Sequence, residues 1–257
     1  DSGGGAGIQA DLKTFSALGV YGASVITALT AQNTRGVTAV HDVPPAFIRA
    51  EMDAVFSDIR IDAVKIGMLS QPAVIRAVRE GLDAWRVGTV VLDPVMVATS
   101  GDVLLVPEAV ATLREVLIPR ATVITPNLAE AATLLGTSQA RNRDEMLAQG
   151  SALVAMGAQA VLIKGGHGGG GEAEDVLVTP DSADWFSVQR LQTQSTHGTG
   201  CTLSSAIAAG LAMGLDLVQA IRAAKAYLTA AIRSSDRLGI GHGHGPVDHF
   251  HAWWPAR

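Results

Sequence analysis

The residues best suited to chemistry form a glycine-rich turn in the last quarter of the chain, Gly198-Thr199-Gly200-Cys201. An alanine-rich apolar run with helical spacing follows, which predicts that this turn opens a helix over 201–213. The first backbone amides of a helix have no intrahelical partners and point outward with the positive end of its dipole. The two glycines carry no Cβ atom that would keep an anion away. The turn is therefore predicted to bind phosphate, or the charge on a transferring phosphoryl group.

Cys201 is the only cysteine of the chain and lies inside this turn. A thiol at a helix N-terminus has a lowered pKa, which makes Cys201 a candidate base or thiolate. A small buried cysteine beneath a helix cap is an equally good interpretation of this residue taken alone. A single cysteine cannot form an internal disulfide.

Composition narrows the class of protein. Of the 257 residues, 48% are hydrophobic and 17% charged, which excludes a disordered chain and favours one large domain over 1–257. The net charge of -5 and the lack of a basic stripe exclude a nucleic-acid partner. Neither a signal peptide nor an apolar run long enough to span a bilayer is present, so we expect no membrane partner and a cytoplasmic location.

Segments of strand and helix character alternate along the whole chain, without a long linker or an internal repeat. The segment 88–93 is apolar on both faces, as a parallel strand between two layers of helices should be. The alternation predicts an α/β fold with a doubly wound, mostly parallel central sheet flanked by helices on both faces. A small antiparallel edge is predicted near 174–189. The other predicted strands are 24–31, 63–68, 121–125 and 160–164; the predicted helices are 9–18, 45–56, 72–85, 107–117, one that starts at 127, 143–156 and 217–233.

Polar side chains gather where predicted strands end. Ligands of doubly wound sheets bind at the carboxyl ends of the strands, and Asp93, Asn127 and Lys164 fall there, as do Gln32 and Met68. Asp93 could hold Mg²⁺ through water, and Lys164 could reach a phosphate. Structural interpretations stay open, because Asp93 could also start a turn and Lys164 could extend to solvent.

Three further motifs have structural explanations. Asn127 and Glu130 have the spacing of a capping box, which accounts for both residues without a functional role. The glycine-rich segment 166–171 fits a dinucleotide-binding fingerprint, but the residues after it are acidic and then strand-like, so no helix N-terminus is available for a pyrophosphate. We expect a hairpin loop there, over the nucleotide. Four of the seven histidines lie in the tail, where their spacing places no metal-ligand pair on one helix face.

Six motifs in chain order resemble those of the hydroxymethylpyrimidine/phosphomethylpyrimidine kinases, which are ribokinase-like enzymes of thiamine biosynthesis. The resemblance covers essentially the whole chain. The family begins with a strand that leads into the loop at Asp1, and we expect that strand to be missing here. The motifs are GGAGIQADLKT (4–14), TAQNT (30–34), KIGM (65–68), TPNLAE (125–130), KGGH (164–167) and HGTGCTLS (197–204).

The resemblance implies a ribokinase-like fold and ATP-dependent phosphorylation of 4-amino-5-hydroxymethyl-2-methylpyrimidine, first to its monophosphate and then to its diphosphate. ATP and Mg²⁺ would be the cofactors, and a homodimer is expected. The positions that match the family's pyrimidine site are Gln32, Asp11, Met68 and Val95. Those that match its nucleotide and metal site are Lys164, Asn127, Thr196, Glu130 and Asp93. Glu130 would then be both a cap partner and a metal-sphere residue.

Many members of the superfamily have an aspartate base where this chain has Cys201, and the resemblance to the pyrimidine kinases argues against a sugar kinase. Three rival functions stay open. A pyridoxal kinase would use a similar pocket and could share the cysteine. A nicotinamide-dependent oxidoreductase would depend on segment 166–171 alone, and a non-catalytic binding relative would not need a thiol at the phosphoryl position.

Overall fold

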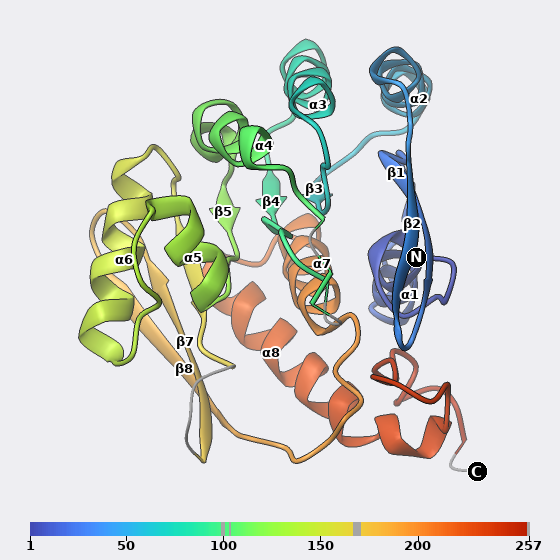
Figure 1. Cartoon of the computed structure of the whole chain (residues 1–257), viewed down its shortest axis with the longest axis vertical. Helices are drawn as coiled ribbons and strands as arrows, with labels where there is room; N and C mark the ends of the chain where they lie inside the picture. Colours follow the sequence, from blue (N-terminus) through green and yellow to red (C-terminus); the bar gives the residue numbers. More distant parts are fainter. Residues whose placement is uncertain (99–100, 103, 167–170, 256–257) are drawn as a thin grey trace.

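A six-stranded sheet organises the chain, with the strand order β3-β4-β5-β6-β7-β8 (Figure 1). The structure is a computed structural model that describes residues 1–98, 101–102, 104–166 and 171–255. Strands β3 to β6 are parallel, and β7 and β8 extend the sheet as an antiparallel edge. The predicted doubly wound sheet and its antiparallel edge are confirmed. The strands are β3 Val64–Ile66, β4 Val90–Leu92, β5 Val123–Ile124, β6 Val161–Lys164, β7 Glu172–Val178 and β8 Ala183–Gln189.

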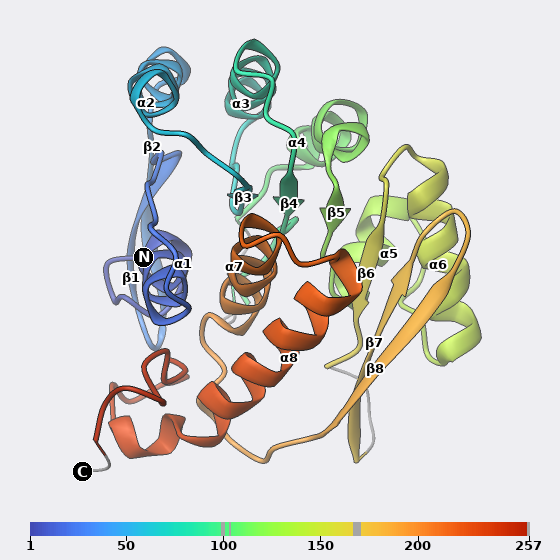
Figure 2. The same ribbon diagram turned by 180° about the vertical axis from the view of Figure 1, so that it is seen from behind.

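Helices cover both faces of this sheet (Figures 1 and 2). On one face lie α2 Pro45–Asp58, α3 Pro72–Ala84, α4 Pro107–Thr112, α5 Leu128–Leu135 and α6 Arg143–Ala155. On the other lie α1 Gly7–Ala17, α7 Thr199–Ala212 and α8 Leu217–Arg233. A π-helical turn Leu113–Leu117 and two 3₁₀ turns, Ile118–Arg120 and Ser235–Leu238, complete the helical segments. Within the described ranges, no helix combines the length and apolar character needed to cross a bilayer.

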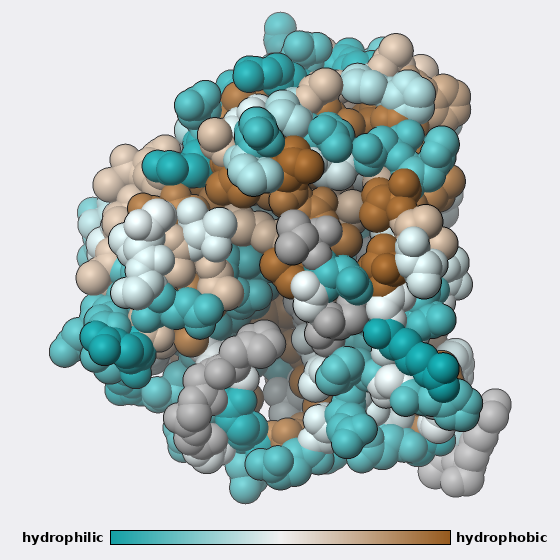
Figure 3. Space-filling view, in the orientation of Figure 1, coloured by the Kyte–Doolittle hydropathy of each residue, from teal (hydrophilic) through white to brown (hydrophobic). Residues whose placement is uncertain are grey.

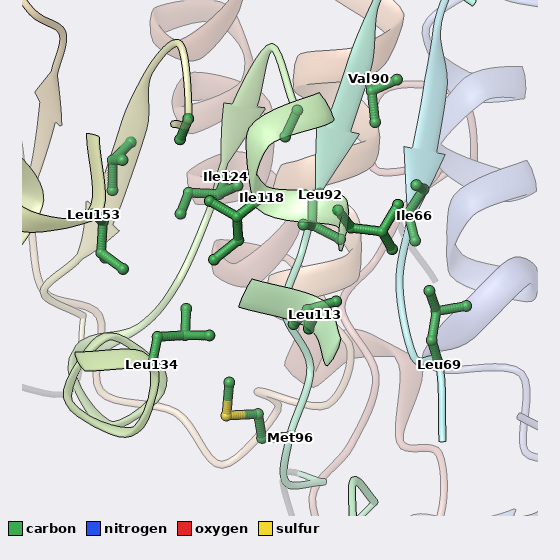
Figure 4. Packing of buried hydrophobic residues seen from close by; sticks show 14 of the residues in the cluster. Ile66, Leu69, Val90, Leu92, Met96, Leu113, Ile118, Ile124, Leu134 and Leu153 are labelled. Atoms are coloured by element: carbon green, nitrogen blue, oxygen red, sulfur yellow. The ribbon is translucent and has the colours of Figure 1, made fainter. Parts of the chain in front are cut away.

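Successive side chains of each strand point to opposite faces of the sheet, so a separate hydrophobic core forms on each face. In β4, Val90 and Leu92 pack with α2 to α6, whereas Val91 between them packs with α7 and α8. In β6, Ile163 and Leu162 divide between the two cores in the same way. Figure 4 shows the first core around Leu92, between the strands and the helices that cover them. Because successive side chains of a strand point to opposite faces, an all-apolar strand is buried on both sides.

The first predicted strand, 24–31, is placed wrongly by sequence reasoning. β1 Ala28–Asn33 pairs with β2 Gly36–Asp42 in a separate two-stranded antiparallel sheet and does not join the central sheet. The side chain of Asn33 accepts a hydrogen bond from the amide of Arg35 at 2.8 Å, which forms the turn between the strands. Asparagine is a strong turn former, so this reversal was available in the sequence and β2 could have been predicted.

The C-terminal tail packs against the N-terminal third of the chain. The amide of His244 donates to the carbonyl of Thr34 at 2.8 Å, and the indole of Trp253 donates to the carbonyl of Ala17 at 3.1 Å. His249 is buried, and its Nε2 atom lies 3.0 Å from the hydroxyl of Thr202 on α7. Burial lowers the pKa of His249 to about 4, and the ammonium of Lys13 contributes to the shift.

This buried histidine predicts an acid-sensitive fold. Folded His249 stays neutral, whereas the unfolded chain takes up its proton near the ordinary pKa of 6.5, so stability is lost as the pH falls from about 6.5 toward 4. Between pH 7 and pH 5 the free energy of unfolding should fall by about 2 kcal/mol through this group. Urea unfolding of the wild type and of His249→Gln at both pH values measures it. Equal pH slopes in the two proteins would contradict the prediction.

Candidate active site

The carboxyl ends of β3, β4, β5 and β6 open onto one cavity of about 1290 Å³. In Figure 3 this face of the molecule is hollowed near its centre, and hydrophobic side chains gather above the hollow. Residues 20–26, which belong to no helix or strand, and residues of β3 also line this cavity. Every predicted site residue lines it: Asp11, Gln32, Met68, Asp93, Val95, Asn127, Glu130, Lys164, Thr196, Gly198, Thr199, Gly200 and Cys201.

The glycine-rich turn opens α7 as predicted, although the helix begins at Thr199 and not at residue 201. Gly198 is its N-cap, with a φ of 79° that disfavours any residue with a Cβ atom. A Cβ atom on Gly200 would lie 3.5 Å from both Asp93 Oδ2 and Lys164 Nζ, so this glycine faces the charged groups directly. One expectation changes: the amide of Thr199 is not free, because it donates to the carbonyl of Thr196 at 3.3 Å.

Asp93, Lys164 and Glu130 form a charged cluster beside this turn. Lys164 Nζ lies 2.9 Å from Asp93 Oδ1 and 3.9 Å from Glu130 Oε2. Asp93 is almost completely buried and also accepts hydrogen bonds from the hydroxyls of Thr125 at 3.1 Å and Ser204 at 3.3 Å. The interpretation of Lys164 as a solvent-directed side chain is therefore wrong, because its ammonium group is paired in the interior. Asp93 does begin a turn, since its carbonyl accepts from the amide of Val95, but its buried carboxylate is engaged in this cluster as well.

The two carboxylates of this cluster differ in the direction of their pKa shifts. Burial alone would raise the pKa of Asp93, but the ammonium groups of Lys164 and Lys65 hold it below its ordinary value. Burial raises the pKa of Glu130 to about 7, against the attraction of Lys164, and the charge of Asp93 adds to the rise. Near neutral pH the cluster thus contains one firmly ionised carboxylate and one that takes up a proton easily.

Glu130 also completes the capping box of α5. Its carboxylate accepts from the amide of Asn127 at 2.7 Å, and the side chain of Asn127 accepts from the amide of Glu130 at 2.9 Å. The structural interpretation of this pair is confirmed. It does not exclude a second role, because Glu130 is buried at the cavity wall next to Lys164.

Asp11 belongs to a second charged group, which sequence reasoning missed in part. Lys65 Nζ lies 2.8 and 3.0 Å from the two carboxylate oxygens of Asp11, and the hydroxyl of Ser205 donates to the same carboxylate at 2.6 Å. Lys65 appeared in the sequence only as part of a motif. A lysine inside a short apolar strand was the available signal, since a charge buried there needs a partner.

The thiol of Cys201 differs from expectation. Burial raises the pKa of Cys201 above its ordinary value. Lys65 acts in the opposite direction, but the nearby carboxylates of Asp11 and Asp93 add to the rise. The prediction of a lowered thiol pKa is therefore wrong, because the fold buries the thiol and also brings it close to two carboxylates that the sequence alone did not place there.

The remaining predicted residues contribute to the walls of the cavity. The Oε1 atom of Gln32 accepts from the hydroxyl of Thr30 at 3.0 Å, and this side chain is half-buried. The carbonyl of Met68 accepts from the hydroxyl of Thr27 at 2.9 Å, and the amide of Val95 donates to the carbonyl of Asp93 at 2.8 Å. Of these contacts, the one between Thr27 and Met68 joins the segment before β1 to the segment after β3.

The structure bears on two further motifs, the glycine-rich segment 166–171 and the histidines of the tail. Strand β7 follows segment 166–171 directly, so no helix N-terminus meets that segment and the dinucleotide reading fails. Most of the expected loop over the nucleotide, residues 167–170, lies outside the described residues. In the ranges that the structure describes, no group of three His, Cys, Asp or Glu side chains could hold a metal ion.

Residues 1–248 match the family model described as phosphomethylpyrimidine kinase. The chain belongs to this kinase family. It is 61% identical over 254 residues to a hydroxymethylpyrimidine/phosphomethylpyrimidine kinase from Rhizobium meliloti, which covers 99% of this chain and 95% of the relative. It is 54% identical to the enzyme of the same name from Escherichia coli, again over 254 residues, with 99% of this chain and 96% of the relative covered. Family membership identifies the chain as a phosphotransferase.

Solved structures agree with the fold. An ADP complex of Bacillus subtilis pyridoxal kinase matches with a TM-score of 0.90 at 39% identity, over 99% of this chain and 96% of that one. A phosphomethylpyrimidine kinase from Clostridium difficile matches with a TM-score of 0.80 at 47% identity, over 90% of this chain and 95% of that one. The ribokinase-like fold expected from the resemblance is confirmed.

Gly198 offers a direct test of the turn geometry. A Cβ atom there would lie 1.8 Å from the carbonyl oxygen of Gly5, in addition to the strain of the positive φ. Gly214 is a matched control, because its φ is 87° and nothing lies within 4 Å of the Cβ position. We expect Gly214→Ala to cost about 1–2 kcal/mol of stability through strain alone. Gly198→Ala should cost about 1–3 kcal/mol more through overpacking.

Urea unfolding and the rate of phosphoryl transfer measure this difference. Gly214→Ala should keep wild-type activity, because the residue ends α7 at the far end from the turn. Equal stability and equal activity in the two variants would show that the turn does not press against the loop at Gly5.

Proposed function

We propose that the chain transfers the γ-phosphoryl group of ATP to the hydroxymethyl oxygen of 4-amino-5-hydroxymethyl-2-methylpyrimidine, and then phosphorylates the monophosphate product to the diphosphate. One observation carries the proposal. The glycine turn of α7, the Asp93–Lys164–Glu130 cluster and Gln32 line a single cavity, although they come from distant parts of the sequence. A relative named hydroxymethylpyrimidine/phosphomethylpyrimidine kinase and another named as a thiamine biosynthesis bifunctional protein support the same assignment.

We assign each part of the cavity to the substrate group that its side chains suit by charge and polarity. The turn at Gly200 would hold the transferring phosphoryl group. Lys164, whose Nζ atom lies 3.5 Å from where a Cβ atom on Gly200 would be, would balance its charge. The ring of the pyrimidine would lie toward Gln32, Asp11, Met68 and Val95, with the amide of Gln32 pairing with the aminopyrimidine edge. Asn127 and Thr196 would contact the nucleotide. In such transfers the protein contributes mainly position and charge neutralisation.

Mg²⁺ fits this arrangement as an ion that arrives with the nucleotide. Asp93 and Glu130 provide the carboxylate oxygens that Mg²⁺ prefers, and two carboxylates plus substrate phosphates are a usual ligand set for this ion. The ion would supply neutralisation of phosphate charge.

A homodimer and a cytoplasmic location belong to the same proposal. The hairpin of β1 and β2 exposes Leu29 by 52% and Val40 by 43%, and strand pairing places these side chains on opposite faces of the hairpin. A partner chain would bury these apolar side chains by packing against the hairpin.

We also propose that residues 1–257 act as one domain, because residues from Asp1 to His244 line the same cavity. An unpaired cysteine suits a reducing compartment.

Turnover with defined acceptors tests the function. Purified protein is assayed for ADP formation with ATP, Mg²⁺ and one of three acceptors: the pyrimidine alcohol, its monophosphate or pyridoxal. We expect turnover of both pyrimidines and weaker turnover of pyridoxal. A protein that phosphorylated pyridoxal and neither pyrimidine would overturn the proposal.

Removal of Cys201 should affect the two steps differently. The first acceptor is an alcohol that must lose a proton, whereas the second is a phosphate that is already ionised. Because burial raises the thiol pKa, the thiolate fraction grows with pH, so the first step should accelerate about tenfold per unit between about pH 6 and pH 8. Cys201→Ala should lose this acceleration and keep the second step. Equal losses in both steps would argue against proton transfer by Cys201.

Gln32 should govern the affinity for the pyrimidine. Loss of one hydrogen-bonding side chain in Gln32→Ala should raise the KM for the alcohol about tenfold, with the KM for ATP unchanged. Gln192→Ala is the matched control, since Gln192 is exposed and is not part of the cavity wall. An unchanged KM for the alcohol in Gln32→Ala would refute the assignment.

A charged side chain introduced on the β1–β2 hairpin tests the proposed dimer. Leu29→Asp should shift the protein toward the monomer in analytical ultracentrifugation, because a carboxylate in an apolar interface is costly to bury. Met213→Asp is the control, with a side chain that is 54% exposed at the end of α7. A wild-type protein that sediments as a monomer would contradict the proposed dimer.

A further inference from the structure

A buried histidine–aspartate contact links the two loops that open onto the phosphoryl site. His197 precedes the glycine turn of α7, and its Nε2 atom lies 2.8 Å from Asp1 Oδ2. His197 is 6% exposed, and the side chain of Asp1 is 2% exposed. The mechanism above uses neither residue, although both line the cavity.

The carboxylate of Asp1 organises the loop that precedes α1. It accepts hydrogen bonds from the backbone amides of Gly3 at 2.7 Å, Gly5 at 3.0 Å and Ala6 at 2.9 Å. With His197, this one carboxylate therefore has four donors. Hydrogen bonds to an ionised acceptor are stronger than those between neutral groups, so the loop before α1 has a fixed shape.

His197 is fixed from the other side as well. Its amide donates to the carbonyl of Gly245 at 3.0 Å, in a short parallel bridge to the C-terminal tail. The two loops approach so closely that a Cβ atom on Gly5 would lie 2.3 Å from Cδ2 of the His197 ring. A Cβ atom on Gly198 would meet the carbonyl of Gly5 in turn. The histidine ring thus sits in a slot between the loop, the turn and the tail.

The two linked segments carry opposite halves of the site. The turn after His197 would hold the phosphoryl group, whereas the loop of Asp1 leads into α1, which carries Asp11 on the acceptor side. We propose that His197 and Asp1 are positioning residues, whose contact sets the register of the phosphoryl-binding turn against the acceptor side of the cavity. This inference rests on the proposed function. A misplacement of about 1 Å can cost a phosphoryl transfer about a hundredfold in rate.

Substitution of His197 separates positioning from general packing. The side-chain amide nitrogen of a glutamine can reach the place of Nε2, whereas a leucine fills the slot without a donor. We expect His197→Gln to keep kcat within about threefold of the wild type. His197→Leu should lower kcat about tenfold to a hundredfold in both phosphorylation steps, with smaller changes in both KM values.

A double-mutant cycle with Asp1→Ala tests the contact itself. Asp1→Ala should lower kcat at least as much as His197→Leu, because it also removes the hydrogen bonds from Gly3, Gly5 and Ala6. The double variant should lose little more than Asp1→Ala alone, because the contact with His197 is already absent there. Circular dichroism at the assay temperature checks folding. If His197→Leu is unfolded, the comparison of His197→Gln with His197→Asn replaces it, since the shorter asparagine cannot reach Asp1.

The outcomes are separable from those of the proposed function. A folded His197→Leu with wild-type kcat, or multiplicative losses in the double variant, would overturn the positioning role. If the wild type turns over neither pyrimidine, the proposed function fails. The same cycle is then measured on the slow hydrolysis of ATP without an acceptor, where a loss in His197→Leu restored by glutamine supports positioning and equal rates refute it.

Discussion

Burial of several charges around one cavity is the constraint on which this structure depends. Asp93 and Asp11 lie on different elements, and each is held by a lysine from a strand of the central sheet, Lys164 on β6 and Lys65 on β3. A buried charge without a partner is strongly destabilising, so the strands, α1 and α7 must meet in the geometry that pairs them. The hydroxyls of Ser204 and Ser205, adjacent on α7, each bond one of the two aspartates and fix the helix between them.

This pairing leaves the amino end of α7 beside a cluster of groups suited to phosphate and metal chemistry. Two apolar cores, one on each face of the sheet, hold the strand ends in place. Lys164 ends strand β6, whose other residues are buried, and is stabilised as a cation. Asp93 and Glu130 raise its pKa, although burial would lower it. A cation that is held in this way can meet an anionic ligand without reorganisation, which is how preorganised sites lower a barrier.

The ends of the chain complete the site. The loop from Asp1 touches the turn before α7, and the tail from Gly245 onward supports the same turn from its other side. His249 and Thr202 join the tail to the buried face of α7. Close packing between loops demands residues without side chains at the contacts, which explains Gly5 and Gly198 better than flexibility does.

The sequence by itself determined the layered fold, since apolar strands alternating with amphipathic helices have few other ways to bury their side chains. It also determined the turn at Gly198–Cys201 and the capping box of Asn127 and Glu130, because both depend on residues close together in the chain. The hairpin of β1 and β2 was only partly predictable. Its turn could be predicted from the sequence, but its separation from the central sheet could not. Only the tertiary structure decided the pairing of Lys65 with Asp11, the raised pKa of Cys201 and the contact of His197 with Asp1. Each of these depends on distances between groups far apart in sequence, and no local pattern encodes such distances.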